Sequence, residues 1–505
     1  MKKIKKNIIW GFGGQLLSLA ISIILPRLII VNFGSETNGI TSTITQIFVY
    51  VALLESGIGS AALTCLYKNI AENDQSGIAQ TISAAHKYYK KLLPLYLCCV
   101  LALAIVFPLI IDTTVSAKTI RFLILIQGAC GTVNFLFTNA HLQLLVADGR
   151  TYVSSILTLL VKVISVSGQI LLIAIGYDIV SVQFSALLAY ILQAIVVNLY
   201  VKKKYPWLTV SSDADISILD QRRSFIIHEV SGVVFQSTDL FLISVFCSIK
   251  EASIYAVYSM IFSALGNLMS ILMRSIDFNL GAEYHRDLQK YIKIHDFYET
   301  LYVCFVFAVI SAAYLVTLPF IRLYTAGVTD VQYSHPALPF LFSAIQILSC
   351  GRMVCSKLIA VSGRAKDTIP NTLAEMVINI VASILLVNLL GMVGVLLGTI
   401  LALLYRTNDI LMYANKKVLH RSPWSTYKTL LINLLLFGLF VFISNIITIN
   451  ADNYLQFIVH GLFALVSSLL LYYSVHLALN TSFRRELLTE LSRLTRRLKK
   501  EPNNH

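Results

Sequence analysis

The stretch KKIKKNIIWGFGGQLLSLAISIILPRLIIV, residues 2–31, indicates the fold class of this chain. Four lysines precede an apolar run that begins at Ile8, and a helix needs about 20 apolar residues to cross the hydrocarbon layer of a membrane. The run is too long for the apolar part of a signal peptide, and no small-residue cleavage site follows it. We therefore interpret residues 8–31 as the first membrane span.

The remainder of the chain has the same character. Of its 505 residues 57% are apolar and 13% are charged, and the mean hydropathy is +0.74. A soluble domain is about 25% charged. The second predicted span is residues 38–65, and further apolar runs of spanning length, separated by short polar breaks, continue as far as Leu479. The sequence predicts an all-α polytopic membrane protein of about 14 transmembrane helices.

The positions of lysine and arginine predict the orientation. The chain has 40 of these residues against 26 acidic ones, a net charge of +14. We expect no nucleic-acid partner, because a chain so poor in charge has little water-exposed surface for a basic groove. Short cytoplasmic loops carry an excess of basic residues. With the amino terminus inside, thirty of the 40 lie in cytoplasmic segments and four outside, so both termini are predicted to be cytoplasmic.

A faint internal repeat predicts two lobes. Phe33-Gly34-Ser35 matches Phe246-Cys247-Ser248 after 213 residues, and Gly149-Arg150 matches Gly363-Arg364 after 214. Transporters are often built from such duplicated bundles. The predicted organisation is an N-terminal six-helix lobe over residues 1–201, a cytoplasmic linker over 202–223, a second six-helix lobe over 224–415, two further helices over 416–480 and a basic amphipathic cytoplasmic tail over 481–505.

Charged residues inside the predicted spans are the candidate site residues, because intramembrane charges usually face the protein interior or a wet cavity. A guanidinium holds a phosphate through a planar two-pronged contact, and an ammonium acts as a point charge. Cations around a central cavity would therefore suit a diphosphate-bearing substrate. The candidate diphosphate-binding cations are Arg27, Lys162, Arg274 and Arg352. Buried carboxylates can take up H⁺ or coordinate Na⁺. The candidates for ion coupling or gating are Glu55, Asp239, Asp277 and Glu375.

Several of these charged residues can also be explained by a purely structural role. Lys162 would pair with Glu375, which the repeat places beside the equivalent position of the opposite lobe. Arg352 would be satisfied by backbone carbonyls. Arg406 and Asp409 are three residues apart, and an i,i+3 pair explains them without a function.

Arg274 and Asp277 have the same i,i+3 spacing and form either a structural pair or a gate. His141 belongs to the polar stretch from Asn139 to Gln143, which would face a sugar. A lone membrane histidine is, however, more often a hydrogen-bond partner between helices. These alternatives stay open at the level of sequence.

The cysteines indicate neither a disulfide framework nor a zinc site. All eight fall almost wholly inside apolar runs, with no CxxC motif and no Cys/His spacing typical of metal ligands. We interpret them as small buried apolar residues. The sequence therefore predicts no catalytic residue, no metal and no cofactor.

The tail from Ser482 predicts an amphipathic helix. Leucines and Phe483 lie on one side and most of its arginines and lysines on the other. Such a helix lies at an anionic cytoplasmic membrane surface. Docking to a partner protein is the alternative.

The first hairpin resembles that of the Wzx-type polysaccharide flippases. The resemblance rests on Asn32-Phe33-Gly34-Ser35, on Asn38-Gly39-Ile40 and on the stretch from Glu55 to Ala61, an acidic residue followed by Gly-x-x-small. Glu55 stands where the family usually has Asp, and Asn38 where a second Gly often precedes the Ile. The family belongs to a superfamily that also contains multidrug and toxic compound extrusion (MATE) antiporters and the lipid II flippase.

The resemblance implies a function and a mechanism. Two six-helix lobes would surround a cavity that opens to each side in turn, by alternating access. The chain would move undecaprenyl-diphosphate-linked oligosaccharide to the outer leaflet of the bacterial cytoplasmic membrane, for capsule, O-antigen or exopolysaccharide biosynthesis. Expected partners are this lipid-linked substrate, the bilayer, H⁺ or Na⁺, and a polysaccharide polymerase or glycosyltransferases.

Two other classes compete with this interpretation. A cation-coupled multidrug antiporter or a lipid II flippase would have the same fold. A membrane enzyme such as a polymerase or ligase would need an ordered outer loop for its catalytic site, whereas the longest predicted one, from Leu323 to Pro336, is short. No nucleophile, metal or phosphate-loop motif appears elsewhere, so we expect no enzymatic activity.

Overall fold

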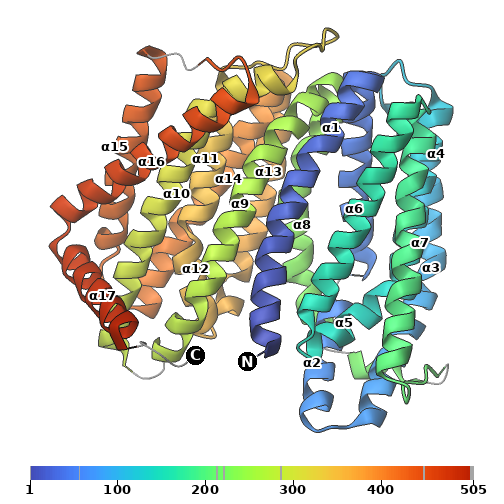
Figure 1. The fold of residues 1–505 in the computed structure, drawn as a ribbon, viewed down its shortest axis with the longest axis horizontal. Helices are drawn as coiled ribbons and strands as arrows, with labels where there is room; N and C mark the ends of the chain where they lie inside the picture. The colour runs from blue at the N-terminus through green and yellow to red at the C-terminus, as the bar shows by residue number, and fades with distance from the viewer. Residues whose placement is uncertain are drawn as a thin grey trace. The chain divides into compact units, whose positions relative to one another are not determined.

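The computed structural model describes residues 2–55, 57–211, 214–219, 222–284, 287–446 and 450–500. Every regular element in these ranges is helical (Figure 1). Twelve candidate spans in this part of the chain are long and apolar enough to cross a membrane. The prediction of an all-α, multi-pass membrane protein is confirmed.

The described residues form two compact units. Unit 1 comprises residues 1–260 with the short segments 327–331 and 387–392. Its elements are α1 (Lys2–Val51), η1 (Ala52–Glu55), α2 (Ile58–Ala71), α3 (Gln75–Ile110), α4 (Ala117–Val133), η2 (Asn134–Thr138), α5 (Asn139–Ala147), α6 (Thr151–Ile175), α7 (Ile179–Lys204), η3 (Ile216–Leu219), α8 (Arg222–Phe246) and the start of α9 (Ile249–Tyr284). Within it α6 packs against both α1 and α7.

Unit 2 contains the rest of α9 and most of the chain that follows. Its elements are α10 (Leu288–Tyr324), α11 (Ala337–Gly351), α12 (Met353–Val361), η4 (Ala365–Thr368), α13 (Ile369–Leu390), α14 (Met392–Tyr413), η5 (Ala414–Val418), α15 (Trp424–Ile446), α16 (Tyr454–Leu479) and α17 (Thr481–Lys500). Helix α10 lies at its centre and contacts α11, α12, α15, α16 and α17.

The first two predicted spans, 8–31 and 38–65, differ from their expected form. Helix α1 runs on to Val51, and Gly34 inside it leaves helical geometry with φ 85° and ψ 166°. The chain then enters η1, and Gly57 with φ 78° precedes α2. The second predicted span is therefore two helices joined through a break after Glu55. The number of fourteen crossings and the cytoplasmic termini stay predictions.

The two turns matched by the internal repeat have the same conformation. Gly149 has φ 67° and Gly363 has φ 73°, the left-handed region that favours glycine. The amide of Arg150 donates to Leu145 O at 2.8 Å, and the amide of Arg364 donates to Ile359 O at 3.2 Å. Each turn ends one helix and begins the next, as a glycine C-cap does. The sequence match at this position therefore reflects a shared backbone turn.

The compact division falls at Met260, whereas the predicted linker is 202–223. The reason is that α8 and the start of α9 bind α1. Asn38 Nδ2 donates to Ser253 Oγ at 2.7 Å, and Thr43 Oγ1 lies 2.6 Å from Ser244 Oγ. The six-helix lobes and the linker drawn from the sequence stay a prediction.

Candidate functional site

Two polar residues meet where helices are interrupted in unit 1. Glu55 ends η1, and Asn139 begins α5 directly after the π-helical turn η2. The Asn139 amide donates to Glu55 Oε2 at 2.7 Å. Interrupted helices often line transporter binding sites, because their freed backbone groups need polar surroundings. Sequence reasoning noted Asn139 only as part of the stretch around His141.

Lys162 is held by hydroxyl groups. Its ammonium donates to Ser18 Oγ at 2.7 Å and to Ser22 Oγ at 2.5 Å, which joins α6 to α1. Both of these acceptors are neutral, so they do not neutralise the positive charge of Lys162. A half-buried cation in this condition is suited to an anionic ligand.

Arg352 lies at the break between α11 and α12. It follows Asn139 by 213 residues, so the repeat places both residues at equivalent helix interruptions. Its Nη2 donates to Glu375 Oε1 at 2.9 Å, and the two side chains are 16% and 8% exposed. The expected backbone-carbonyl partner is therefore replaced by a carboxylate of α13. Its Nη1 is buried with no hydrogen-bond partner in the described part of the chain.

Glu375 also pairs with a second guanidinium. Arg406 Nε lies 3.5 Å from Glu375 Oε2, and Arg406 Nη2 donates to Thr372 Oγ1 at 2.9 Å. The other side of Arg406 pairs with Asp409, as the i,i+3 spacing predicted. Asp409 in turn accepts from Asn371 at 2.6 Å. We name Arg352, Glu375, Arg406 and Asp409 the charge cluster; its formal charges sum to zero.

The alternative pairing of Lys162 with Glu375 would join two different compact units and stays a prediction. Lys162 binds serine hydroxyls of α1, and Glu375 binds the two arginines of the charge cluster.

The resemblance motif in α1 forms a polar junction. The Ser35 amide and hydroxyl both donate to Asp330, each at 2.8 Å. Glu36 accepts from the Thr113 hydroxyl at 2.6 Å and from the Thr114 amide at 2.7 Å. Lys250 Nζ at the start of α9 lies 3.8 Å from Glu36. We name residues 34–39 with these partners the α1 junction.

Gly39 permits the closest approach in this junction. A Cβ atom at this position would lie 2.1 Å from the backbone oxygen of Ile249, the first residue of α9. Only glycine therefore fits between α1 and α9 without a backbone shift. Gly39 is part of the motif that carries the family resemblance. Nothing in the sequence indicates its contact with Ile249, which lies 210 residues later in the chain.

The remaining candidate site residues from the sequence lie on α1, α8 and α9. Asp239 on α8 is 5% exposed and accepts from the Tyr255 hydroxyl of α9 at 3.3 Å. Arg27 follows Pro26 inside α1 and is partly buried. The side chains of Arg274 and Asp277, both in α9, lie outside the described residues.

This architecture is shared with solved transporters. It is similar to "Lipid II flippase MurJ, inward closed conformation" over 93% of this chain and 98% of that chain, with a TM-score of 0.73 and 14% sequence identity. An inward-facing multidrug resistance MATE family transporter of the MOP superfamily is similar over 79% of this chain and 93% of that one, with a TM-score of 0.56 and 16% identity. A MOP superfamily transporter from Pyrococcus furiosus is similar over 83% and 97%, with a TM-score of 0.53 and 14% identity.

No protein-family model matches the sequence, and no curated protein matches it. The chain has the fold of the MurJ and MATE transporters, as the superfamily resemblance implied. The Wzx subtype stays a prediction.

Proposed function

We propose that the chain is a flippase that moves undecaprenyl-diphosphate-linked oligosaccharide from the cytoplasmic to the outer leaflet of a bacterial cytoplasmic membrane, by alternating access, for surface polysaccharide biosynthesis. The observation that carries the proposal is the environment of the Arg352 side chain. Its guanidinium is largely buried at a helix break, Nη2 is held by Glu375, and the buried Nη1 has no hydrogen-bond partner among the described residues. Such a group binds a phosphate through planar hydrogen bonds.

The structural similarity supports the same class. The likeness to the lipid II flippase covers 93% of this chain, and the likeness to the MATE transporter covers 79%. We assign diphosphate binding to Arg27, Lys162, Arg274 and Arg352. Lys162 contributes a positive charge with only hydroxyl partners, which adds attraction without a two-pronged geometry.

The acidic candidates have coupling or gating roles in this proposal. Glu55 joins two interrupted helices, Asp239 joins α8 to α9, and Glu375 is the counter-ion of Arg352. Asp277 is the fourth residue to which we assign a coupling or gating role. H⁺ or Na⁺ is the proposed coupling ion. The α1 junction closes the predicted outer side of unit 1, and its hydrogen bonds break when that side opens.

The test is translocation in inverted membrane vesicles. A labelled undecaprenyl-diphosphate oligosaccharide is added on the cytoplasmic face, and its protection from an external glycosidase is followed with and without the protein. We expect protein-dependent protection, loss of it in Arg27→Ala and Arg352→Ala, and partial recovery in Arg352→Lys. Absence of protein-dependent protection refutes the proposal. Normal transport in both alanine variants shows these cations to be structural.

Exposed cations provide the matched control. Lys366 lies in η4 with its side chain exposed, so Lys366→Gln removes one positive charge outside the site. We expect this variant to transport like the wild type. The amount of each variant in the membrane is measured alongside, since a folding defect would also reduce transport. A polysaccharide polymerase and glycosyltransferases are the proposed functional partners.

A cation-coupled multidrug antiporter is the second candidate, favoured by the similarity to MATE transporters. An antiporter site of this kind needs a carboxylate that can receive a cation. Glu375 already pairs with two guanidiniums, which disfavours this reading. Drug-dependent transport without flipping would support the antiporter, and flipping of lipid II alone would support a lipid II flippase.

A further inference from the structure

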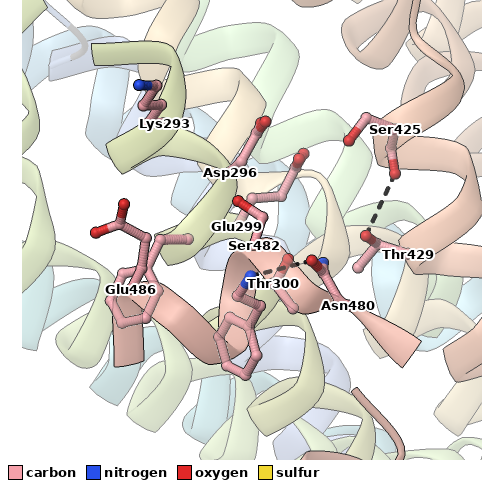
Figure 2. A pocket seen from close by; sticks show the side chains of 11 residues that line it. Lys293, Asp296, Glu299, Thr300, Ser425, Thr429, Asn480, Ser482 and Glu486 are labelled. Carbon is pink, nitrogen blue, oxygen red and sulfur yellow. Dashed lines mark hydrogen bonds between the residues drawn. The ribbon is translucent and has the colours of Figure 1, made fainter. Parts of the chain in front are cut away.

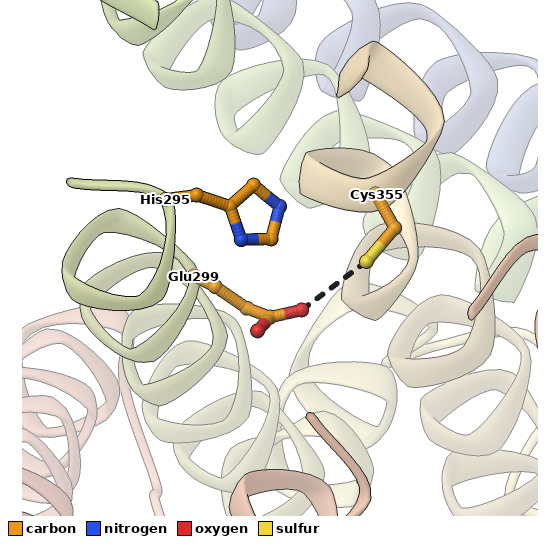
Figure 3. Close-up of side chains that lie close together, drawn as sticks. All are labelled: His295, Glu299 and Cys355. Atoms are coloured by element: carbon orange, nitrogen blue, oxygen red, sulfur yellow. Dashed lines mark hydrogen bonds between the residues drawn. The ribbon is translucent and has the colours of Figure 1, made fainter. Parts of the chain in front are cut away.

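Three side chains with metal-binding atoms meet inside unit 2. His295 and Glu299 lie one helical turn apart on α10, and Cys355 lies on α12. Their exposed fractions are 0%, 4% and 1%. One imidazole nitrogen, one carboxylate oxygen and the sulfur all lie within 4.8 Å of one another. Figure 3 shows the imidazole ring beside the Glu299 carboxylate, with the Cys355 sulfur directed at the same carboxylate.

The imidazole of His295 is unsatisfied. Neither Nδ1 nor Nε2 has a hydrogen-bond partner in the described part of the protein although the side chain is fully buried. Leaving a buried polar atom without a partner costs about 1–3 kcal/mol. Nδ1 lies 3.6 Å from Asp296 Oδ1. A metal ion bound at Nε2 would satisfy that nitrogen, and the nearby Asp296 carboxylate is placed to orient the ring as a carboxylate does behind a metal-bound histidine.

The charges around the site favour a divalent cation. Glu299 accepts hydrogen bonds from the Cys355 thiol at 3.2 Å and from the Thr426 hydroxyl at 3.0 Å, both neutral groups. The nearby guanidinium of Arg421 is paired with Asp296 at 2.6 Å and 2.8 Å. Glu299 and a deprotonated Cys355 would together balance the two positive charges of a metal ion.

A cavity borders one of the three side chains, that of Glu299. It has a volume of about 80 Å³ and is lined by Asp296 and Glu299 of α10, by α15 and by the start of α17. Figure 2 shows Lys293, Asp296 and Glu299 along one wall and Ser425 and Thr429 on another. Glu299 belongs both to the cavity lining and to the buried group, so an ion would reach the group from the Glu299 side.

We propose that His295, Glu299 and Cys355 form a Zn²⁺-binding site. Imidazole, thiolate and carboxylate are the zinc ligands of proteins, and three of them with one water complete a tetrahedral shell. Ligand atoms around tetrahedral zinc lie about 3.3–3.8 Å apart. The Cys355 sulfur and Glu299 Oε1 are 3.2 Å apart, and all three ligand atoms lie within 4.8 Å of one another, so small side-chain rotations would bring them into this range. On binding, the S–H bond of Cys355 breaks, a Zn–S bond forms, and the proton is released to solvent.

This inference revises the expectation that the chain has no metal site. The sequence did not indicate these ligands, because Cys355 lies 56 residues after Glu299 and has no second cysteine at CxxC spacing. None of its three residues belongs to the charge cluster, but Cys355 follows Arg352 by three residues on the chain. Zinc binding is therefore measured directly and separately from transport.

The test uses the full-length protein in detergent, stripped of metal with a chelator. Zinc bound per chain is measured by plasma mass spectrometry after Zn²⁺ addition, and Co²⁺ is used as a spectroscopic probe of thiolate coordination. We expect one Zn²⁺ per chain and a Co²⁺-thiolate absorption band. Cys355→Ser should abolish the band, and His295→Gln should weaken zinc binding about 100-fold or more. Cys304→Ser, a buried cysteine on the same helix α10, should change neither.

Several results would overturn the proposal. One is wild-type protein that takes up no stoichiometric Zn²⁺ at micromolar concentrations. Another is an unchanged Co²⁺ band in Cys355→Ser. Since a variant can misfold, X-ray absorption of zinc in the wild-type protein gives a separate criterion. A first shell with one sulfur and two or three nitrogen or oxygen atoms supports the site, and a shell of oxygen alone refutes it.

Discussion

Glu375 is the residue whose loss should damage the charge cluster most. Its carboxylate is 8% exposed and serves two guanidiniums, with 2.9 Å to Arg352 and 3.5 Å to Arg406. In Glu375→Gln, Arg406 keeps Asp409, but Arg352 loses its carboxylate partner. Removing one partner of a buried ion pair costs about 3–5 kcal/mol. Because the Arg352 side chain is 16% exposed, we expect the lower end, about 3 kcal/mol.

Arg352→Gln should be milder, because Glu375 keeps Arg406 as a counter-ion. We expect a loss of about 1–2 kcal/mol. In the double variant Arg352→Gln/Glu375→Gln the unpaired guanidinium is gone, so stability should exceed that of Glu375→Gln alone. The coupling free energy between the two sites should be about 1–3 kcal/mol.

The assay is reversible unfolding of purified protein in mixed micelles with increasing SDS, which gives a free energy of unfolding for each variant. Glu72→Gln is the control, because its side chain is exposed at the end of α2, and it should change stability by less than about 0.5 kcal/mol. If Glu375→Gln unfolds like this control, the cluster does not depend on its shared carboxylate. If the double variant is less stable than Glu375→Gln, the assigned pairing is wrong.

Three further variants test other parts of the structure. Gly39→Ala places a Cβ 2.1 Å from Ile249 O and should lower the midpoint of thermal unfolding, whereas Gly13→Ala on the open side of α1 should leave it unchanged or raise it; equal midpoints would contradict the close approach. Lys162→Met should reduce flipping at least about tenfold with less than about 1 kcal/mol of lost stability, since an apolar chain replaces both donor and charge; transport at the wild-type rate in vesicles would refute its role. Tyr472→Phe removes a buried hydroxyl 2.8 Å from Ser311 and should cost about 0.5–1.5 kcal/mol in SDS unfolding, and no cost would show that the bond contributes nothing.

Sequence patterns predict the class of this protein because the bilayer imposes helix length on each span. The repeat also identified a real backbone feature, since Gly149 and Gly363 form the same left-handed turn. The i,i+3 pair of Arg406 and Asp409 followed from helix geometry alone. In each case the information lies within a few residues of the chain, or in a local motif that occurs twice.

Partners on separate helices could not be predicted in this way. Arg352 and Glu375 are 23 residues apart on α11–α12 and α13, and Asn38 and Ser253 are 215 apart. Apolar runs give the length of each helix and leave open which neighbour it meets and at what rotation. The break after Glu55 was missed because the stretches on either side of it are apolar enough together to be taken as one span.

The tail helix has a consequence for how lipids act on the protein. Phe483 is 2% exposed and stacks on Phe297 of α10 with ring centroids 5.5 Å apart, and the Phe483 amide donates to Asn480 at 3.0 Å. Leu488 of the same helix is 61% exposed. If α17 lies at the membrane surface as predicted, any tilt of α10 must push this helix into the headgroups or lift it out. Anionic lipid content and headgroup packing would then set part of the free-energy difference between transport states.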